Sequence, residues 1–164
     1  MSGFDKERIL LAWLAPDSFA IMESLTYTAK NGDMVMCRPI YKENADGTPF
    51  EMFFVSDLGS QPIITDTIVG DRCGKITLAS IIHDWLFRVR QVSRNGVMVD
   101  IDEAYADNLL MEMCLDSACS ESKAEAAATY CGVCAGGWWV WNQHPKLDLS
   151  TVDENYKGED FVIL

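Results

Sequence analysis

Positive charge is scarce in this chain. Its 164 residues include 13 Lys and Arg against 25 Asp and Glu, which gives a formal net charge of −12 at pH 7. Binding along a nucleic-acid backbone depends on basic side chains that displace the counterions of the phosphates. The composition therefore indicates that nucleic acid is not a partner.

Long apolar runs are lacking as well. A membrane-spanning helix needs roughly 18 or more consecutive apolar residues, and no stretch of the sequence approaches that length. The N-terminal sequence MSGFDKERILLAWLAP has charged residues ahead of a short apolar run and no small-residue cleavage site, so it does not resemble a signal peptide. We therefore predict a protein without a transmembrane segment that is made in a cytoplasm.

The sequence also lacks a second pair of ligands that would complete a zinc site. Cys131 and Cys134 have the spacing of a metal knuckle or a redox motif, but no second CxxC or histidine pair accompanies them. In a cytosol the six cysteines are expected to be reduced and to pack as small hydrophobes. A Cys131–Cys134 bridge is expected only if the protein ends up in an extracellular particle.

A hydrophobic fraction of 49% and a charged fraction of 23% are typical of a folded domain. We expect one globular domain over residues 1–141, starting with a docking helix over 5–14, followed by an acidic, extended tail over 142–164. Residues 25–41 alternate about Asn31-Gly32, which predicts a hairpin with a type I′ turn. A third strand is expected over 50–55.

Helical periodicity dominates the second half of the chain. It predicts helices over 77–92, from Asp102 to Met113, and from Ser120 or Ser122 to Ala135, with a connecting loop over 93–99. The predicted fold class is α+β, an N-terminal antiparallel β-meander of about three strands packed with a C-terminal bundle of about three helices. Trp138, Trp139 and Trp141 are expected to form a core plug or a subunit contact.

The helix over 77–90 carries the residues with the greatest chemical potential. Its apolar side chains fall on one face, while His83 and Asp84 lie on either side of the opposite face. Each could therefore meet a different partner across a cleft.

Several segments together resemble a widespread family encoded by tailed phages and prophages, which has no established function. Its pattern is a Thr-Asp-Leu-Ala-Ser-x-Pro loop, an Ala-x-x-x-His-Asp-x-Leu-Tyr helix, a Ser-Arg pair and an Ala-Asp helix. The chain departs from it mildly, with Ser56, Gly59 and Phe87 in place of the Thr, Ala and Tyr. The matching segments are FFVSDLGSQP at 53–62, ASIIHDWLF at 79–87, Arg94, AYADNLLMEM at 104–113 and Gly-Gly-Trp-Trp at 136–139.

The resemblance implies that Asp57, His83, Asp84 and Asp107 converge. The set is similar to the site of phospholipases A2, in which a His-Asp pair on one helix faces an Asp on another, although the half-cystines and the glycine-rich calcium loop of those enzymes are missing. His83 would act as general base and Asp107 would orient it, while Asp84 and Asp57 could hold a cation such as Ca²⁺. The expected supporting residues are Ser56, Ser60 and Arg94.

A structural role for the same residues stays open. His83 bonded to Asp107 or Ser56 would specify helix packing. Asp84 and Asp107 could also be buried with arginine counter-charges, the candidates being Arg88, Arg90 and Arg94. His144 is expected to be exposed and idle.

Two functions from different classes follow. The first, slightly favoured because no obvious nucleophile or metal triad is present, is a phage virion-associated or tail-assembly accessory protein. It would be made in the host cytoplasm, be incorporated in the virion, and contact other phage structural proteins or itself through its termini. The second is a small metal-assisted hydrolase of ester or amide bonds. A His83–Asp107 hydrogen bond beside an open pocket that Asp84 faces would favour the hydrolase, and a sealed cluster would favour packing.

Overall fold

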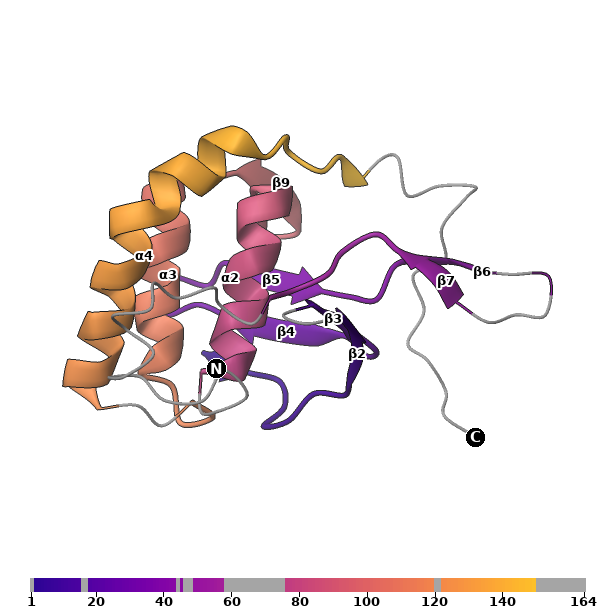
Figure 1. Cartoon of the computed structure of the whole chain (residues 1–164). Helices are drawn as coiled ribbons and strands as arrows, with labels where there is room; N and C mark the ends of the chain where they lie inside the picture. Colours follow the sequence, from indigo (N-terminus) through magenta and orange to yellow (C-terminus); the bar gives the residue numbers. More distant parts are fainter. Residues whose placement is uncertain are drawn as a thin grey trace.

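The computed structural model describes residues 2–15, 18–43, 45, 49–57, 76–119 and 122–149. This part of the chain has the predicted α+β architecture, with strands in the N-terminal half and long helices after them (Figure 1). The strands are β1 (Gly3–Phe4), β2 (Leu11–Ala15), β3 (Ser18–Ile21), β4 (Leu25–Thr28), β5 (Met34–Cys37), β6 (Tyr41–Glu43), β7 (Pro49–Met52), β8 (Gln91–Arg94) and β9 (Val97–Asp100). The helices are α2 (Thr77–Val89), α3 (Glu103–Cys114) and α4 (Lys123–Gln143).

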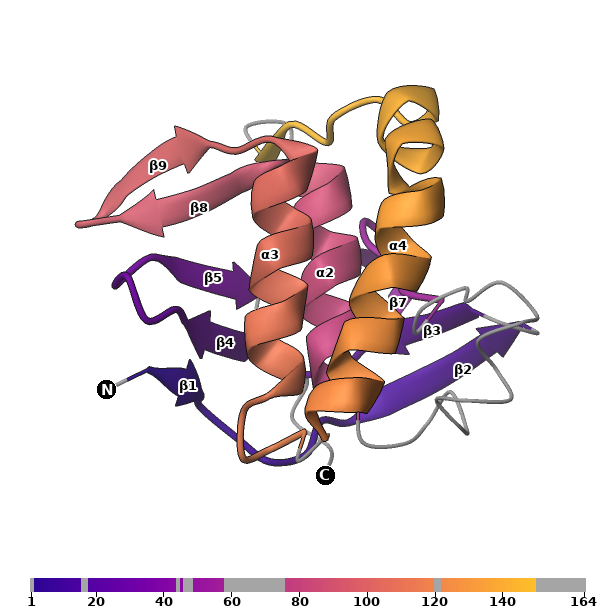
Figure 2. The same ribbon diagram turned by 90° about the vertical axis from the view of Figure 1, so that its left-hand side faces the viewer.

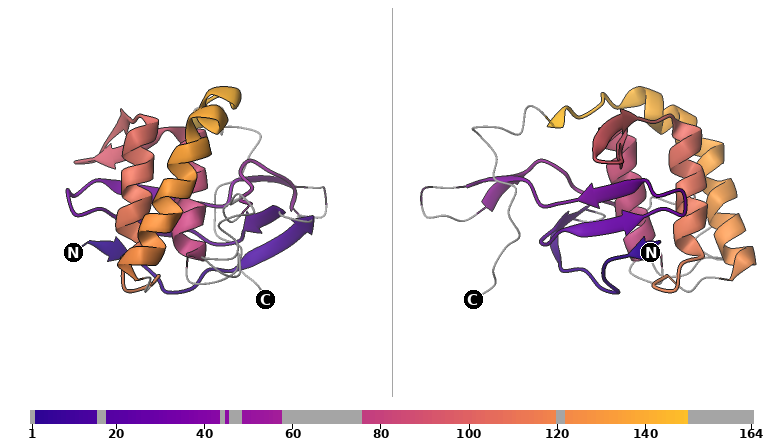
Figure 3. Two further views of the ribbon diagram at one scale, coloured as in Figure 1. Left: turned by 60° about the vertical axis from the view of Figure 1, so that its left-hand side comes forward. Right: turned by 180° about the vertical axis from the view of Figure 1, so that it is seen from behind.

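The largest sheet is antiparallel and has the strand order β1-β4-β5-β8-β9 (Figure 2). Helix α2 packs against β4 and β5 on one side and against α3 on the other, and α3 in turn packs against α4. Figure 3 shows the helical layer in front of the strands in one view and behind them in the other. The core between the layers is made of large apolar side chains that are fully buried, among them Ile21, Leu25, Tyr27, Val35, Ile81, Ile82, Leu86, Val89 and Met113.

The N-terminal segment is extended, so the helix predicted over residues 5–14 is wrong. Strand β1 pairs with β4, and β2 pairs with β3. The carboxylate of Asp5 accepts a hydrogen bond from the Thr26 backbone N–H at 2.9 Å, which ties the N-terminal segment to β4. A short apolar run is compatible with either structure, and the pairing partner at 18–21 decides between them.

The two Asn-Gly turns have different geometries. The hairpin of β4 and β5 is confirmed, but only Gly32 of its turn has a positive φ, of 87°. Asn95 and Gly96 both have positive φ, of 53° and 80°, and they join β8 directly to β9. The type I′ turn is therefore at Asn95-Gly96, where the sequence had predicted a loop. At the other turn, the backbone N–H of Gly32 donates a hydrogen bond to the carbonyl of Ala29.

The predicted third strand has a different neighbour from the one expected. Strand β7 pairs with β6 in a separate two-stranded ladder, and the place beside β5 is taken by β8. Helix α2 ends at Val89 because Arg90 adopts a left-handed conformation with φ of 59°, and the chain then turns directly into β8. Three residues of the predicted helix therefore belong to the turn and the next strand.

The predicted starts of the last two helices, at Asp102 and at Ser122, are confirmed. Asp102 accepts a hydrogen bond from the Tyr105 N–H at the start of α3, and Ser122 and Glu125 form the reciprocal capping box of α4. Helix α4 continues to Gln143, so the tryptophans lie within it. No helix in the described residues is long and apolar enough to cross a membrane. The acidic tail predicted from residue 142 lies outside the described residues from 150 onward.

Arg94 belongs to a polar network around the buried carboxylate of Asp33, on the sheet side of α3. Its guanidinium donates two hydrogen bonds to Asp33, at 2.8 and 2.7 Å. The hydroxyl of Tyr105 donates to the same carboxylate at 2.5 Å, and Asn31 donates to it at 3.1 Å. Asp33 is only 2% exposed, so these partners replace the water that its charge has lost. The network connects the β4–β5 turn with β8 and α3.

We predict that Asp33→Asn lowers the free energy of unfolding by about 2 kcal/mol at pH 7, because the variant loses the charge that these hydrogen bonds stabilise. Hydrogen bonds from Arg94 are the main reason that the pKa of Asp33 lies below its usual range. A lowered folded-state pKa gives stability above the ordinary carboxyl pKa that is lost as the pH falls. The difference between the two proteins in urea denaturation should therefore shrink below about pH 4.

The matched control is Asp100→Asn, which removes a carboxylate from an exposed pair with Lys146. Exposed ion pairs contribute little to stability, so this variant should unfold close to the wild type. Equal losses at Asp33 and Asp100 would contradict a special role for the network around Asp33.

Candidate functional site

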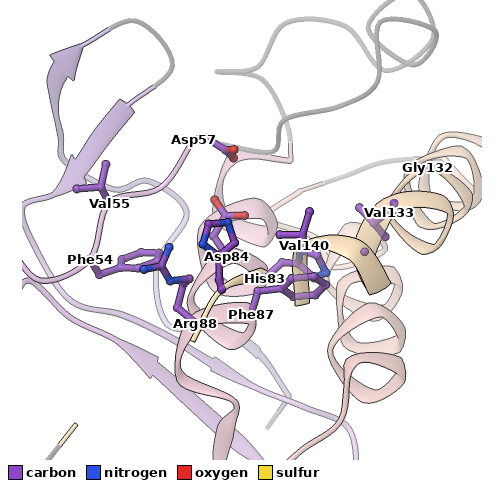
Figure 4. Close-up of a pocket in the computed structure, with 13 residues that line it drawn as sticks. Phe54, Val55, Asp57, His83, Asp84, Phe87, Arg88, Gly132, Val133 and Val140 are labelled. Atoms are coloured by element: carbon purple, nitrogen blue, oxygen red, sulfur yellow. The ribbon is translucent and has the colours of Figure 1, made fainter. Parts of the chain in front are cut away.

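Helix α2 presents His83 and Asp84 to a pocket of about 270 Å³ that lies between α2, α4 and the segment after β7. Figure 4 shows the two side chains between Phe54 and Arg88 on one side and Val133 and Val140 on the other. The pocket is therefore polar at its centre and apolar on much of its wall. Its lining residues are Phe54, Val55, Asp57, His83, Asp84, Phe87, Arg88, Gly132, Val133, Gly136, Gly137, Val140 and His144.

His83 and Asp107 meet, as the resemblance to the family implied. Nε2 of His83, on α2, lies 2.9 Å from Oδ1 of Asp107, on α3, and the two residues are 7% and 3% exposed. The ring makes no further hydrogen bond in the described part of the chain. A carboxylate bonded to Nε2 holds the proton on that nitrogen, so Nδ1 is left as an acceptor.

The second oxygen of Asp107 faces α4. Oδ2 accepts a weak hydrogen bond from Sγ of Cys134 at 3.4 Å. Glu103 lies one turn before Asp107 on α3, and burial, with the charge of Asp107, raises the pKa of Glu103. Carboxylates from two turns of α3 therefore lie near the imidazole.

A glycine lets α4 approach this cluster closely. A Cβ placed on Gly137 would lie 2.9 Å from Oε1 of Glu103 and 3.3 Å from Cζ of Phe87, whereas a Cβ on Gly136 would meet nothing within 4 Å. The Phe87 ring packs against His83 with ring centroids 4.4 Å apart, and Trp141 packs on the other side of Phe87. The close contact at residue 137 thus sets how α4 closes over the imidazole.

Asp84 and Asp57 form the other half of the site. Ser56 donates a hydrogen bond of 2.5 Å from Oγ to Oδ2 of Asp84. The Ser56 backbone is fixed by two hydrogen bonds with Phe19, which hold this segment against β3. Burial, with the negative charge of Asp57, raises the pKa of Asp84 well above its ordinary value. Figure 4 shows both carboxyl groups at the same end of the pocket.

The described residues do not complete the calcium site that the phospholipase likeness implied. No group of three or more His, Cys, Asp or Glu side chains suited to a metal ion occurs among them. Asp57 and Asp84 supply carboxylates, but Ca²⁺ takes roughly six to eight oxygen ligands. Ser60 lies outside the described residues, so its predicted supporting role has no structural counterpart here.

The three arginines have separate roles. Arg94 pairs with Asp33, and Arg90 donates hydrogen bonds to the carbonyls of Trp141 and His144 at the end of α4. Neither therefore neutralises Asp84 or Asp107, as the structural alternative had suggested. Arg88 lines the pocket beside Asp84.

The sequence did not point to α4 as a wall of the site. Val133, Gly136, Gly137 and Val140 line the pocket, and His144 is exposed as predicted yet lies at its edge. The signal in the sequence that could have indicated this wall is the run of small residues in α4, because small side chains permit close contact between helices.

Fold and site together define a class of protein. It is an α+β domain in which a buried His-Asp pair, shared between two helices, faces a pocket. The family model of proteins of unknown function DUF1353 matches residues 21–133, more than half of the chain, and the protein belongs to this family. The matched range includes Asp57, His83, Asp84 and Asp107. Neither the curated proteins nor the solved structures contain a match to the chain.

We predict that Asp84→Asn stabilises the protein at neutral pH. A raised folded-state pKa means that the folded protein favours the protonated carboxyl, so ionisation of Asp84 lowers stability as the pH rises above the ordinary carboxyl pKa. The melting temperature of the variant should exceed that of the wild type at pH 7.5, and the difference should shrink toward pH 4. A constant difference across this range would assign the effect to the altered contact with Ser56.

Proposed function

We propose that the protein is a hydrolase of ester or amide bonds in which His83 is the general base. The observation that carries this proposal is the 2.9 Å contact between His83 and Asp107 at the wall of an open pocket that Asp84 also lines. A histidine that served packing alone would need neither a pocket nor a ring nitrogen that has no partner among the described residues. This arrangement is the one that was expected to favour catalysis.

The chemistry follows from the tautomer that Asp107 selects. Nδ1 of His83 takes a proton from a water molecule, and the water oxygen forms a bond to the carbonyl carbon of the substrate. The bond from this carbon to the leaving oxygen or nitrogen then breaks, and the leaving group takes the proton from His83. Asp107 keeps the ring oriented and stabilises the imidazolium that forms between the two steps.

Asp84 has a different part in the same reaction. It lines the pocket beside His83 on α2, and Ser56 and Asp57 hold its carboxyl group. When it is protonated, it can donate a hydrogen bond to the carbonyl oxygen as negative charge develops there. Base and hydrogen-bond donor would then come from consecutive residues of one helix.

We predict that His83→Ala lowers kcat for an ester substrate by on the order of 100-fold or more, since a positioned general base contributes at least that much. Asp107→Asn should lower kcat in the same direction, because an amide cannot hold the imidazole as a carboxylate does. The test uses 4-nitrophenyl acetate, butyrate and octanoate, together with an anilide, and measures release of the chromophore.

Circular dichroism and thermal denaturation must show that both variants fold, because His83 and Asp107 are buried. A folded His83→Ala protein that keeps full activity contradicts the proposed base. Loss of activity in His83→Ala but not in Asp107→Asn would support His83 as the base and contradict the proposed role of Asp107.

A second candidate has a separate observation behind it. Trp13 on β2 is 71% exposed, and Trp138 and Trp139 on α4 are 66% and 62% exposed. Exposed aromatic side chains are typical of protein contacts, and the sequence motifs resemble those of phage-encoded proteins. We therefore also propose an accessory role in a phage particle or its assembly, with these side chains as contacts.

Mass spectrometry of purified particles tests this candidate. The protein should be present in particles from a host that carries its gene, in a constant ratio to the other structural proteins. Its absence from the particles would contradict a virion role and would leave the hydrolase proposal unaffected.

A further inference from the structure

Arg88 is a cation at the wall of the pocket, and its charge has no partner in the part of the chain that the structure describes. The neighbouring Arg90 is held by carbonyl oxygens of α4 and its end, and Arg94 is held by Asp33. Arg88 makes no ion pair in the described part of the chain, although it lines the pocket. A guanidinium group at a pocket wall that has no ion pair can bind an anionic group that a ligand brings.

The position of Arg88 on α2 sets where this acceptor would lie. Arg88 follows Asp84 by four residues, which places the two side chains one above the other at a separation of about 6 Å along the helix. Figure 4 shows Arg88 and Phe54 on one side of the His83–Asp84 pair and the valines of α4 on the other. The pocket therefore has a cationic end, a reactive centre and an apolar end.

We infer that the substrate carries an anionic group, bound by Arg88, on the acyl side of the bond that is broken, and an apolar leaving group that lies against Val133 and Val140. An acyl chain of the length of a succinyl or glutaryl group spans the distance, because its carboxylate lies about 4–6 Å from the ester carbonyl. This inference rests on the proposed function for the bond that is cleaved. The anion site itself rests on Arg88.

The charge of the whole chain makes the inference more specific. With a net charge of −12, the protein has no general attraction for anions, so anion binding at the pocket must come from a local cation. Asp57 and Asp84 are the acidic groups that line the pocket with Arg88. They are held against each other, with Ser56 as a further partner of Asp84, and neither forms an ion pair with Arg88.

A binding experiment tests the anion site without any reaction. The probe is 4-oxopentanoate, in which a ketone stands for the ester carbonyl two methylenes from a carboxylate, and the neutral control is 5-hydroxy-2-pentanone. Titration calorimetry or amide chemical shifts should show at least 10-fold tighter binding of the anionic ketone, as expected for a charged hydrogen bond. Arg88→Gln should remove this preference, and Arg88→Lys should retain part of it.

A second experiment tests the same preference in hydrolysis. The substrates are mono-4-nitrophenyl glutarate and 4-nitrophenyl pentanoate, which have the same acyl length and differ in the terminal carboxylate. The wild type should favour the glutarate at least 10-fold in kcat/KM, and Arg88→Gln should lose this ratio. Lys123→Gln is the matched control, because it removes an equal charge from the far end of α4.

The outcomes separate the two proposals. Arg88-dependent binding of 4-oxopentanoate without hydrolysis of either ester would support the anion site and contradict the hydrolase. Hydrolysis of both esters with equal kcat/KM would support the hydrolase and overturn the anion site. Equal binding of the two ketones, or a preference for the anion that survives in folded Arg88→Gln, would also overturn the anion site.

Discussion

The hydrogen bond between His83 and Asp107 is the constraint on which the rest of the site depends. An imidazole and a carboxylate taken out of water must satisfy each other, because an unpaired buried polar group costs about 1–3 kcal/mol and an unpaired charge costs more. The pair lies where α2 packs against α3, so it also determines which sides of the two helices face each other. The same contact therefore specifies the packing and selects the tautomer of His83. A structural and a catalytic role are for this reason compatible in one pair of residues.

Helix α3 carries polar side chains in two directions. Tyr105 and Asp107 are two residues apart, which on a helix turns them about 200° from each other. Tyr105 accordingly donates to Asp33 on the sheet side, and Asp107 bonds to His83 on the side of α4. Together, these two contacts restrict the rotation of α3 about its axis and its position along the sheet. The network of Asp33 and Arg94 thus supports the site from behind without taking part in it.

The elements that the sequence predicts well are those with local signals. The caps at Asp102 and Ser122 and the apolar face of α2 depend on neighbouring residues, and all three are confirmed. The errors arise where distant partners decide. Residues 11–15 form a strand because residues 18–21 pair with them. Arg94 was expected to support the site, but it pairs with Asp33 instead, because β8 lies beside β5 in the sheet. The convergence of His83 and Asp107 was implied by the resemblance to a family, since spacing alone cannot fix which faces of two helices meet.

The pocket combines two parts of the chain that are held in different ways. His83, Asp84 and Asp107 lie within the range that matches the family, whereas Gly136, Gly137, Val140 and His144 lie beyond residue 133, where that match ends. The outer part is positioned by contacts of its own: Arg90 holds the carbonyls at the end of α4, the Leu147 N–H donates to the Arg88 carbonyl, and Trp141 packs on Phe87. The outer wall also touches the His83–Asp107 pair, because a Cβ on Gly137 would lie 3.6 Å from Oδ2 of Asp107, so a change there would alter both what the pocket admits and the setting of the pair. The shape of the pocket and the packing of the His83–Asp107 pair are thus coupled through α4, which contacts both.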